Sequence, residues 1–362
     1  MTLALRLAAK GQRTASPNPM VGAVVVAQGR IVGQGFHLRP GLPHAEILAL
    51  RQAGSHAQGA TLYVTLEPCC HRNKRTPPCV PEVIRSGISC VVIAMHDPNP
   101  SVKGKGAAAL RRAGLSVTVG IAGREAEALN EAYSHWIKTK RPYVILKAGM
   151  TLDGKIATAS GEAEWITSKQ ARQDVHDLRS RVDAILAGIG TVLADDPALT
   201  ARIAPHFNKP ASKQPLRIVV DSVLRIPMKA AILSDQESAK TVVAATDSAS
   251  ASRRRMLLKQ GIEVLTLPTV RGKVSLPALM RELGRRGVTS LLVEGGGEIN
   301  AAMLKAKLVR HVRLYMAPVL LGGVDAKGLI GGKSPARFAS ALRLRNVTTR
   351  FVGSDLLVEG DL

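Results

Sequence analysis

The sequence predicts an α/β protein of two domains, because strand-like and helix-like segments alternate twice along its 362 residues. The first alternation ends near residue 133, and the second begins near residue 142. Between them, Trp136–Pro142 is polar and basic and ends in a proline, so we place the boundary between residues 141 and 142. The segments 1–141 and 142–362 are each long enough to bury a hydrophobic core.

In the first segment, Val21–Ala27 and Ile31–Phe36 are apolar, β-branched runs separated by a turn at Gly29, which predicts a hairpin. Further strands are expected over Thr61–Leu66, Ile88–Ala94 and Leu115–Val119. Helices are expected over Leu3–Lys10, His44–Gln52, Cys79–Ser86, Ala107–Ala113 and Arg124–Tyr133. The alternation after the hairpin predicts parallel pairing in the second half of this layer.

In the second segment, Ser168–Arg181 is expected to be a long polar helix with Ser168 as its N-cap. Further helices are expected over Leu276–Arg286 and Glu298–Lys305, and Ser248–Ser252 is expected to be a loop. Strands are expected over Val144–Met150, Ala184–Gly188, Leu216–Asp221, Thr241–Ala245, Ile262–Leu265 and Ser290–Glu294, with terminal strands inside Val309–Leu320 and Leu342–Glu359. This is a second α/β layer.

Composition limits the function classes. Apolar residues make up 46% of the chain and no apolar run reaches membrane-spanning length, so we expect a soluble, cytoplasmic protein without a membrane span. Three of the four cysteines lie between residues 69 and 79, which indicates metal binding rather than a disulfide framework. The formal net charge of +23 is scattered along the chain without interleaved aromatic residues, so it favours anionic small substrates over nucleic acid.

Zinc ligands crowd into one stretch of the first segment. His44 is followed two residues later by Glu46, and Pro68-Cys69-Cys70 and Pro77-Pro78-Cys79 follow. A catalytic zinc takes about three His or Cys ligands plus a water, and the base that moves the protons of that water does not bind the metal. Histidine–carboxylate followed by Pro-Cys and a second Cys is the pattern of zinc-dependent base deaminases. We therefore expect His44, Cys69 and Cys79 as ligands and Glu46 as the base, with Cys70 as the alternative to Cys69.

A glycine run in the second segment suggests an anion site. Gly295, Gly296 and Gly297 follow an expected strand and precede an expected helix, where freed backbone N–H groups can hold cofactor phosphates. The chain lacks a G-x-G-x-x-G motif after a strand, which argues against a Rossmann domain. Lys147 and Asp153 flank the end of the first strand of this segment, where they could polarise a substrate or form a structural ion pair.

Short motifs are spread along nearly the whole chain. In the first half they are Pro17-Asn18-Pro19, His44-Ala45-Glu46, Leu66-Glu67-Pro68-Cys69, Thr76-Pro77-Pro78-Cys79 and Asp97-Pro98-Asn99-Pro100. In the second half they are Lys147 to Gly154, Ser160-Gly161-Glu162, Trp165-Ile166-Thr167-Ser168, Thr191 to Arg202 and Val293-Glu294-Gly295-Gly296. In this order the motifs resemble the RibD family of bifunctional riboflavin biosynthesis proteins. The family usually has eight residues between its two zinc cysteines, whereas nine separate Cys69 from Cys79 here and eight separate Cys70 from Cys79.

The resemblance implies a cytidine-deaminase-like α/β/α domain followed by a dihydrofolate-reductase-like α/β domain. The first would deaminate, with one Zn2+, a diaminopyrimidinone that carries a ribosylamino 5′-phosphate. The second would use NADPH to reduce the ribosyl group of the product to ribityl. It implies cofactor contacts by Gly149, Trp165, Thr191, Asp195, Ser222, Gly295, Gly296 and Gly297, and substrate contacts by Ala163, Arg179, Leu199, Arg202 and Glu294. Ala163 stands where some members carry serine. Both fold types commonly form homo-oligomers.

Three other interpretations remain open at this point. A nucleic-acid base deaminase usually has two residues between its cysteines and needs stacking aromatics, and aromatic residues make up only 3% of this chain. A zinc-stabilised binding protein whose second domain only senses NADPH or nucleotide is a non-catalytic alternative. A deaminase with a degenerate, NADPH-sensing reductase half is a milder one, and it is motivated by Ala163. Asn18, His37 and Lys103 are candidates for the substrate phosphate in the deaminase half.

Overall fold

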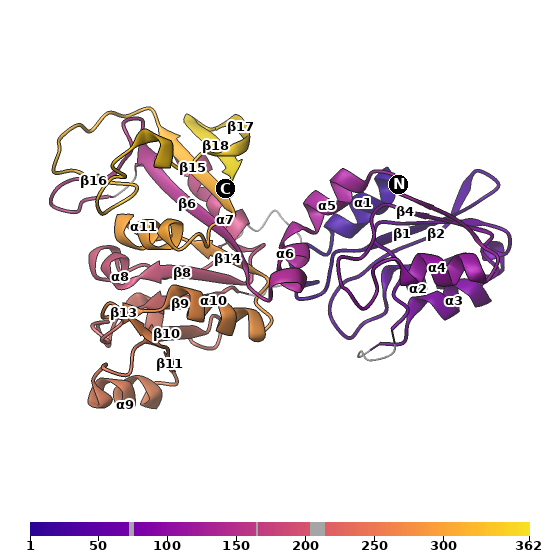
Figure 1. The fold of residues 1–362 in the computed structure, drawn as a ribbon, viewed down its shortest axis with the longest axis horizontal. Helices are drawn as coiled ribbons and strands as arrows, with labels where there is room; N and C mark the ends of the chain where they lie inside the picture. The colour runs from indigo at the N-terminus through magenta and orange to yellow at the C-terminus, as the bar shows by residue number, and fades with distance from the viewer. Residues whose placement is uncertain (72–75, 164–165, 203–213) are drawn as a thin grey trace. The chain divides into compact units, whose positions relative to one another are not determined.

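The computed structural model describes residues 1–71, 76–163, 166–202 and 214–362. The chain divides into two compact units, Met1–Lys140 and Arg141–Leu362, and each is described by itself (Figure 1).

The first unit is built on a five-stranded sheet with the order β2-β1-β3-β4-β5. Its strands are β1 (Gly22–Ala27), β2 (Arg30–Phe36), β3 (Thr61–Val64), β4 (Cys90–Ile93) and β5 (Ser116–Val119). The β1–β2 hairpin and the β1–β3 pair are antiparallel, whereas β3–β4 and β4–β5 are parallel. The expected hairpin and the expected parallel second half are both confirmed.

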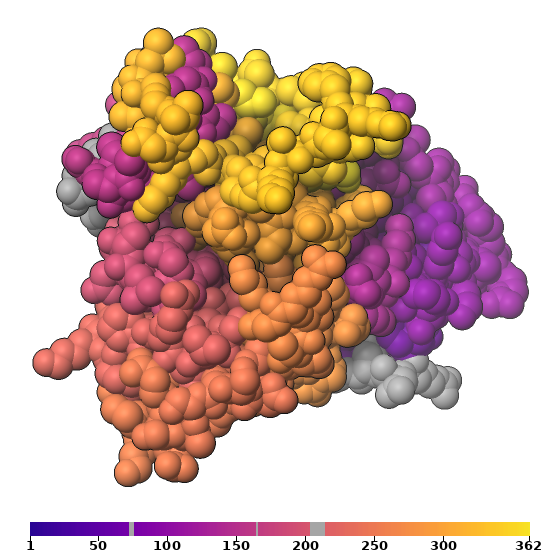
Figure 2. Space-filling model, turned by 60° about the vertical axis from the view of Figure 1, so that its left-hand side comes forward, coloured from indigo at the N-terminus to yellow at the C-terminus, as the bar shows by residue number. Residues whose placement is uncertain are grey.

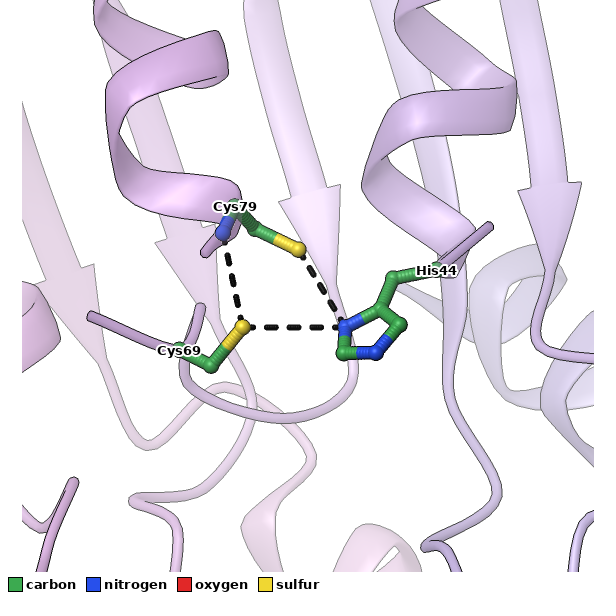
Figure 3. A group of neighbouring side chains, drawn as sticks. All are labelled: His44, Cys69 and Cys79. Carbon is green, nitrogen blue, oxygen red and sulfur yellow. Dashed lines mark hydrogen bonds between the residues drawn. The ribbon is translucent and has the colours of Figure 1, made fainter. Parts of the chain in front are cut away.

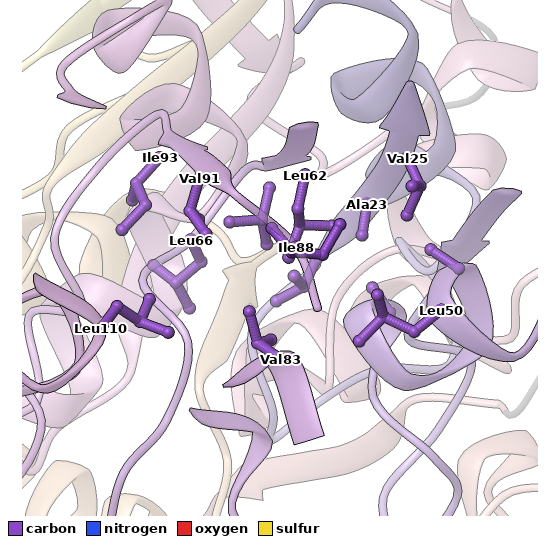
Figure 4. Close-up of a cluster of buried hydrophobic side chains, with 14 of the residues drawn as sticks. Ala23, Val25, Leu50, Leu62, Leu66, Val83, Ile88, Val91, Ile93 and Leu110 are labelled. Atoms are coloured by element: carbon purple, nitrogen blue, oxygen red, sulfur yellow. The ribbon is translucent and has the colours of Figure 1, made fainter. Parts of the chain in front are cut away.

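Successive side chains of a strand point to opposite faces of the sheet. Both faces of this sheet carry apolar side chains, and helices cover both. Ala23 and Val25 of β1 join a core with α2 (Ala45–Ala53), α3 (Cys79–Arg85) and α4 (Lys105–Arg112) (Figure 4). Val24 points to the other face, where α1 (Thr2–Ala9) packs. A Cβ added at Gly33 of β2 would lie 2.1 Å from the carbonyl oxygen of Ala49, so α2 rests directly on the strand backbone. This close packing positions the start of α2, where His44 and Glu46 lie.

The prediction of a single helix over Arg124–Tyr133 is wrong in one respect. The structure has two helices there, α5 (Gly123–Leu129) and α6 (Glu131–Thr139), separated at Asn130. The buried Asn130 side chain accepts a hydrogen bond from the Met20 N–H (2.8 Å) and donates one to the Met20 carbonyl (3.0 Å). This contact between residues 110 positions apart holds the break, and no local pattern reveals it.

The second unit contains a nine-stranded sheet with the order β11-β10-β9-β8-β14-β6-β15-β18-β17. The strands are β6 (Tyr143–Thr151), β8 (Ala184–Gly188), β9 (Leu216–Val220), β10 (Thr241–Ala245), β11 (Glu263–Thr266), β14 (Ser290–Val293), β15 (His311–Ala317), β17 (Arg345–Val352) and β18 (Asp355–Asp361). Pairing is parallel from β11 through β15, and β18 and β17 are antiparallel additions. The carboxyl ends of the parallel strands therefore share one edge, which is where ligands bind in open α/β sheets.

Helices cover this sheet too: α7 (Lys169–Arg179), α8 (Ile189–Asp195), α9 (Ala251–Lys259), α10 (Leu276–Arg285) and α11 (Gly297–Lys305). Leu291 and Val293 of β14 pack with α10 and α11, whereas Leu292 packs on the opposite face with Leu257 of α9. Smaller elements are the strand pairs β7 (Lys155–Ala157) with β16 (Lys327–Gly328) and β12 (Thr269–Val270) with β13 (Lys273–Val274), and 3-10 turns at Gly54–Ala57, Ala231–Leu233 and Phe338–Ser340.

The starts of helices α7 and α9 can be compared with the predictions made from the sequence. Ser168 caps α7 as expected, because its Oγ accepts a hydrogen bond from the Ala171 N–H at 3.2 Å. The loop expected over Ser248–Ser252 is wrong in its second part: α9 begins at Ala251, and Ser250 caps it with a hydrogen bond from the Arg253 N–H. Neither helix α8 nor helix α9 was expected from the sequence. Among the described residues, none of the helices has the length and apolar character needed to cross a membrane.

Candidate active sites

Three zinc-ligand side chains meet in the first unit, two from the starts of helices and one from a loop. His44 directly precedes α2, Cys69 lies in the loop after β3, and Cys79 is the first residue of α3. Their ligand atoms all lie within 4.8 Å of one another (Figure 3). Nδ1 of His44 lies 3.6 Å from Sγ of Cys69 and 3.3 Å from Sγ of Cys79. The expected zinc site is thereby confirmed with Cys69, and Cys70 is not part of the cluster.

The spacing fits the metal. Tetrahedral zinc with Zn–N of about 2.0 Å and Zn–S of about 2.3 Å places nitrogen and sulfur roughly 3.6 Å apart. Both nitrogen–sulfur distances are near this value. Three protein ligands leave the fourth position open, as a catalytic rather than a structural site requires. The backbone also holds the two thiols together, because the Cys79 N–H donates to the Cys69 carbonyl at 3.0 Å.

The tautomer of His44 is set by a residue that sequence reasoning did not single out. Oγ1 of Thr76 lies 3.0 Å from Nε2 of His44. With Nδ1 facing the two sulfurs, Nε2 carries the proton and donates it to this hydroxyl. Thr76 lies in the Thr76-Pro77-Pro78-Cys79 motif, so its closeness to a ligand cysteine was the available signal.

Glu46 lies on the first turn of α2, close to the ligands. It is only 3% exposed, and its Oε2 has no hydrogen-bond partner among the described residues. Burial raises the pKa of the Glu46 carboxyl, the Cys69 thiolate adds to this, and the charge of His44 opposes it. A buried carboxyl with a raised pKa and an unused oxygen beside a metal site can accept and return a proton.

Two phosphate candidates of the deaminase half lie near the cluster. Asn18 Nδ2 is 2.9 Å from Nε2 of His37, and the His37 ring packs edge-on against His44 at 5.2 Å. His37 is 3% exposed, and its Nδ1 lies 3.3 Å from the Pro43 carbonyl oxygen, so both ring nitrogens have a polar neighbour. Lys103 is exposed, in the turn before α4. Asp97, 6% exposed, binds the Tyr133 hydroxyl at 3.1 Å, and burial raises its pKa to about 6.

In the second unit, a buried ion triad lies at the carboxyl end of β14. Glu294 accepts two hydrogen bonds from Arg179, from Nε at 2.6 Å and from Nη2 at 2.9 Å, and Lys147 Nζ lies 3.4 Å away. Burial alone would raise the pKa of Glu294, but the charges of Arg179 and Lys147 outweigh it and hold the pKa at about 2. Burial lowers the pKa of Lys147, Glu294 opposes this, and Arg179 adds to it.

Asp153 does not join this triad. It accepts hydrogen bonds from the Thr151 hydroxyl at 2.6 Å and from the backbone N–H groups of Leu321 and Gly322. The structural ion pair considered for Lys147 and Asp153 is therefore wrong, since the partner of Lys147 is Glu294, 147 positions away. Asp153 instead fixes the chain after β15.

The expected cofactor residues gather along the carboxyl edge of the sheet. Thr191 of α8 accepts a hydrogen bond from the Gly296 N–H at 3.0 Å, which ties the turn after β8 to the glycine turn after β14. A Cβ at Gly295 would lie 2.0 Å from the Ile299 side chain, and one at Gly297 2.7 Å from the Gly328 carbonyl, so neither position tolerates a side chain. Ser222 follows β9, two strands from β14, and accepts from the Val274 N–H.

The remaining predicted positions are placed as follows. Gly149 lies in β6, where a Cβ would approach the Thr167 methyl at 2.9 Å. Burial raises the pKa of Asp195, at the end of α8, against the charge of Lys327. Leu199 is buried with a positive φ of 47°, and the Arg202 N–H donates to His176 Nδ1 at 3.2 Å. Ala163 is half-buried, and Trp165 lies outside the described residues.

Two family models match the chain. Residues 1–95 match the cytidine and deoxycytidylate deaminase zinc-binding region, and residues 142–358 match the RibD C-terminal domain. Riboflavin biosynthesis protein RibD of Escherichia coli is 43% identical over 366 residues, covering 98% of this chain and 96% of that protein. RibD of Actinobacillus pleuropneumoniae is 42% identical over 359 residues, covering 99% and 93%.

Solved structures agree over the full length. An Acinetobacter baumannii RibD superposes with a TM-score of 0.90 at 36% identity and covers 99% of this chain and 97% of that one. A Thermotoga maritima protein described as a diaminohydroxyphosphoribosylaminopyrimidine deaminase/5-amino-6-(5-phosphoribosylamino)uracil reductase superposes at 0.85 with 34% identity, covering 100% and 97%.

Fold and site together define a two-domain enzyme that couples a zinc-dependent deaminase to a reductase. The chain belongs to the RibD family of bifunctional deaminase/reductases of riboflavin biosynthesis. The α/β fold, with an N-terminal cytidine deaminase domain and a C-terminal reductase domain, is as expected from the sequence.

Proposed function

We propose that the first unit deaminates a diaminopyrimidinone carrying a ribosylamino 5′-phosphate, and that the second reduces the ribosyl group of the product with NADPH. The printed description of the Thermotoga maritima relative supports these substrates. The observation that carries the deaminase assignment is the convergence of His44, Cys69 and Cys79 beside Glu46. The Glu46 carboxylate is buried, and its Oε2 has no hydrogen-bond partner among the described residues.

In the deaminase unit, His44, Cys69 and Cys79 would hold zinc, which supplies Lewis-acid activation of the attacking water when bound. Glu46 accepts a proton from that water and passes protons to the ring nitrogen and to the leaving amine. The exocyclic C–N bond breaks, a carbonyl oxygen from water replaces the amine, and ammonia leaves. The raised pKa of Glu46 makes its carboxylate a stronger base and so favours the first of these proton transfers, from the water. The hydroxyl of Thr76 keeps the His44 ring oriented.

In the reductase unit, Lys147, Arg179 and Glu294 would bind and orient the opened ribose phosphate, with Leu199, Arg202 and Ala163 along the same substrate. A guanidinium has five N–H groups. Arg179 directs three donors to Glu294 and to the Thr200 carbonyl, so its remaining N–H groups are those available to a phosphate. Lys147 is the nearby proton donor for the oxygen that forms as the ribose carbonyl is reduced.

NADPH, which supplies the hydride, would lie along the carboxyl edge of the parallel strands. The turn Gly295–Gly296–Gly297 brings backbone N–H groups at the start of α11 to its phosphates, with Gly295 and Gly297 as the proposed donors, because the Gly296 N–H is bonded to Thr191. Gly149, Thr191, Asp195, Ser222 and Trp165 complete the proposed contacts. The hydrogen bond from Gly296 to Thr191 supports a turn that is held in shape before the cofactor arrives.

We also propose that the enzyme is a cytoplasmic homo-oligomer that binds no nucleic acid or membrane. Nine of the nineteen large apolar side chains exposed in the described residues lie between Val319 and Phe351. The end of the chain, in yellow, forms protruding lobes on the surface (Figure 2). We call the exposed apolar side chains of this stretch the 319–351 surface: Val319, Leu320, Leu321, Val324, Ile330, Phe338, Leu342, Val347 and Phe351. We propose that the 319–351 surface binds a second copy of the chain.

A single substitution tests the deaminase proposal. Glu46→Gln keeps the shape of the side chain but removes the proton acceptor. The purified variant should retain one zinc per chain and its NADPH-dependent reductase activity, while ammonia release falls by roughly 10²- to 10⁴-fold. Wild-type ammonia release from the zinc-loaded variant would remove Glu46 from the proposed mechanism.

A further inference from the structure

A second buried carboxylate lies close to the zinc cluster, and the proposed chemistry does not use it. Glu67 follows β3 and precedes Cys69 by two residues. It is 2% exposed, and the one ionisable side chain found paired with it among the described residues is His96, at 2.8 Å from its Oε2. A buried carboxylate is costly unless several donors satisfy it. Glu67 must therefore be held by other groups.

Those groups are backbone N–H donors from one segment. Oε2 accepts from Gly104 at 2.9 Å and from Asp97 at 3.3 Å, and Oε1 accepts from Ala107 at 2.9 Å. The Glu67 N–H donates to the Met95 carbonyl at 3.0 Å. Both the side chain and the backbone of Glu67 thus bind residues 95–107.

Two of these donors belong to the first turn of α4. Gly104 is its N-cap and has no capping side chain, so Glu67 caps the helix from another part of the chain. A carboxylate at a helix N-terminus is favoured by the unpaired N–H groups and by the helix dipole. A Cβ added at Gly106 would lie 2.1 Å from the Pro68 carbonyl oxygen, so the first turn of α4 packs on the backbone that leads into Cys69.

Cys69 is therefore held from two sides. Its carbonyl accepts from the N–H groups of Cys79 and Val80 at the start of α3, at 3.0 and 3.2 Å. On the other side, Glu67 and Pro68 lock the preceding backbone to α4. The same carboxylate orders the Asp97 turn, where Asp97 in turn accepts from the Asn99 N–H at 2.9 Å and from Tyr133.

We propose that Glu67 is a positioning residue for deamination: it holds Cys69 in ligand geometry and sets the Asp97–Asn99 turn relative to the metal. It acts through the backbone of Pro68 and Cys69 and touches no reacting atom. The inference rests on the proposed zinc deaminase function. The Glu67 carboxylate has four hydrogen-bond partners: His96 and the backbone N–H groups of Asp97, Gly104 and Ala107. Glu67→Gln would replace one acceptor oxygen with an NH2 group that faces N–H donors, so at least one of these four hydrogen bonds is lost.

The test uses the full chain with Co2+ in place of zinc, because the visible spectrum of cobalt reports ligand geometry. Glu67→Gln should shift or weaken the cobalt bands and lower metal affinity by about 10- to 100-fold. It should lower kcat for ammonia release more than it raises KM. Gly106→Ala, which presses on the Pro68 carbonyl from the helix side, should produce the same spectral change. Glu82→Gln is the matched control, since Glu82 is an exposed carboxylate on α3 paired with Arg85.

The outcomes separate the inference from the function on which it rests. Wild-type cobalt bands, metal affinity and kcat in folded Glu67→Gln overturn the inference while leaving the deaminase function intact. Loss of the folded first unit in both Glu67→Gln and Gly106→Ala, judged by circular dichroism, assigns Glu67 to stability alone and also overturns it. Absence of ammonia release from the wild-type chain contradicts the proposed function itself. Reductase turnover with the deaminated substrate should be unchanged in every variant.

Discussion

Arg179 and Glu294 lie 115 positions apart in the sequence and form a two-pronged ion pair, with Nε–Oε1 at 2.6 Å and Nη2–Oε2 at 2.9 Å. Both side chains are largely buried, and Lys147 makes the group a triad with one excess positive charge. Removing one partner of a buried ion pair costs far more stability than the intact pair contributes, because the other charge is left buried without a counter-charge. The triad therefore ties the end of α7 to the carboxyl end of β14 and to the middle of β6.

Glu294→Gln is expected to leave two buried cations without a counter-charge. The second unit should lose about 3–5 kcal/mol of unfolding free energy, and reductase turnover should fall sharply while ammonia release persists. Denaturant unfolding together with the two separate assays measures this. The matched control is Glu282→Gln on α10, whose carboxylate pairs with Arg285 and Arg286 nearer the surface. Equal losses in both variants would contradict the special role of the triad.

The same triad predicts a pH dependence. The pKa of Glu294 is about 2 in the folded protein, below its ordinary value. A depressed carboxyl pKa contributes stability that is present above the unfolded pKa, near 4.3, and is lost as pH falls toward the folded value. We therefore expect the unfolding free energy of the second unit to fall between about pH 4.3 and 2 by more in wild type than in Glu294→Gln. Parallel pH profiles of the two proteins would count against it.

Thr76→Val should weaken zinc binding by about 10- to 100-fold, because it removes the hydroxyl that accepts from Nε2 of His44. Thr76→Ser keeps the hydroxyl and serves as the control. Competition with a chromogenic chelator measures both affinities. Equal affinity in the valine variant would show that the His44 ring is oriented without this hydrogen bond.

Cys69→Ser and Cys70→Ser should behave differently although the residues are neighbours. The structure places Sγ of Cys69 within ligand distance of the cluster and leaves Cys70 outside it. Cys69→Ser should abolish stoichiometric zinc and ammonia release, and Cys70→Ser should retain both. Zinc content by atomic absorption decides between them, and the reverse pattern would assign the site to Cys70.

The 319–351 surface predicts a change in assembly. The double substitution Phe338→Asp and Phe351→Asp places two charges on it, so the mass in solution should drop toward that of a single chain. Leu258→Asp, at an exposed apolar position on α9, is the control. Light scattering that shows the same mass for all three proteins, or a wild-type monomer, would reject this surface as the contact.

Local patterns in the sequence carried much of the fold and the metal site. His44, Cys69 and Cys79 could be assigned because short motifs name them, and the strands could be placed because their apolar runs are bounded by glycine and proline. Contacts between distant residues had no such signal. The break at Asn130 depends on Met20, and the partner of Lys147 lies at the end of another strand. Helix α9 was missed as a whole although Ser250 is a typical N-cap, because the helix has few buried residues.

The most direct test of the central claim uses the purified, zinc-loaded chain, the phosphorylated diaminopyrimidinone and mass spectrometry. Without NADPH, the product should have exchanged one amine for oxygen, with one ammonia released. With NADPH, it should in addition have gained two hydrogens, with one NADPH consumed. An unchanged substrate in the presence of bound zinc, or a deaminated product that NADPH leaves unreduced, would contradict the two-step account.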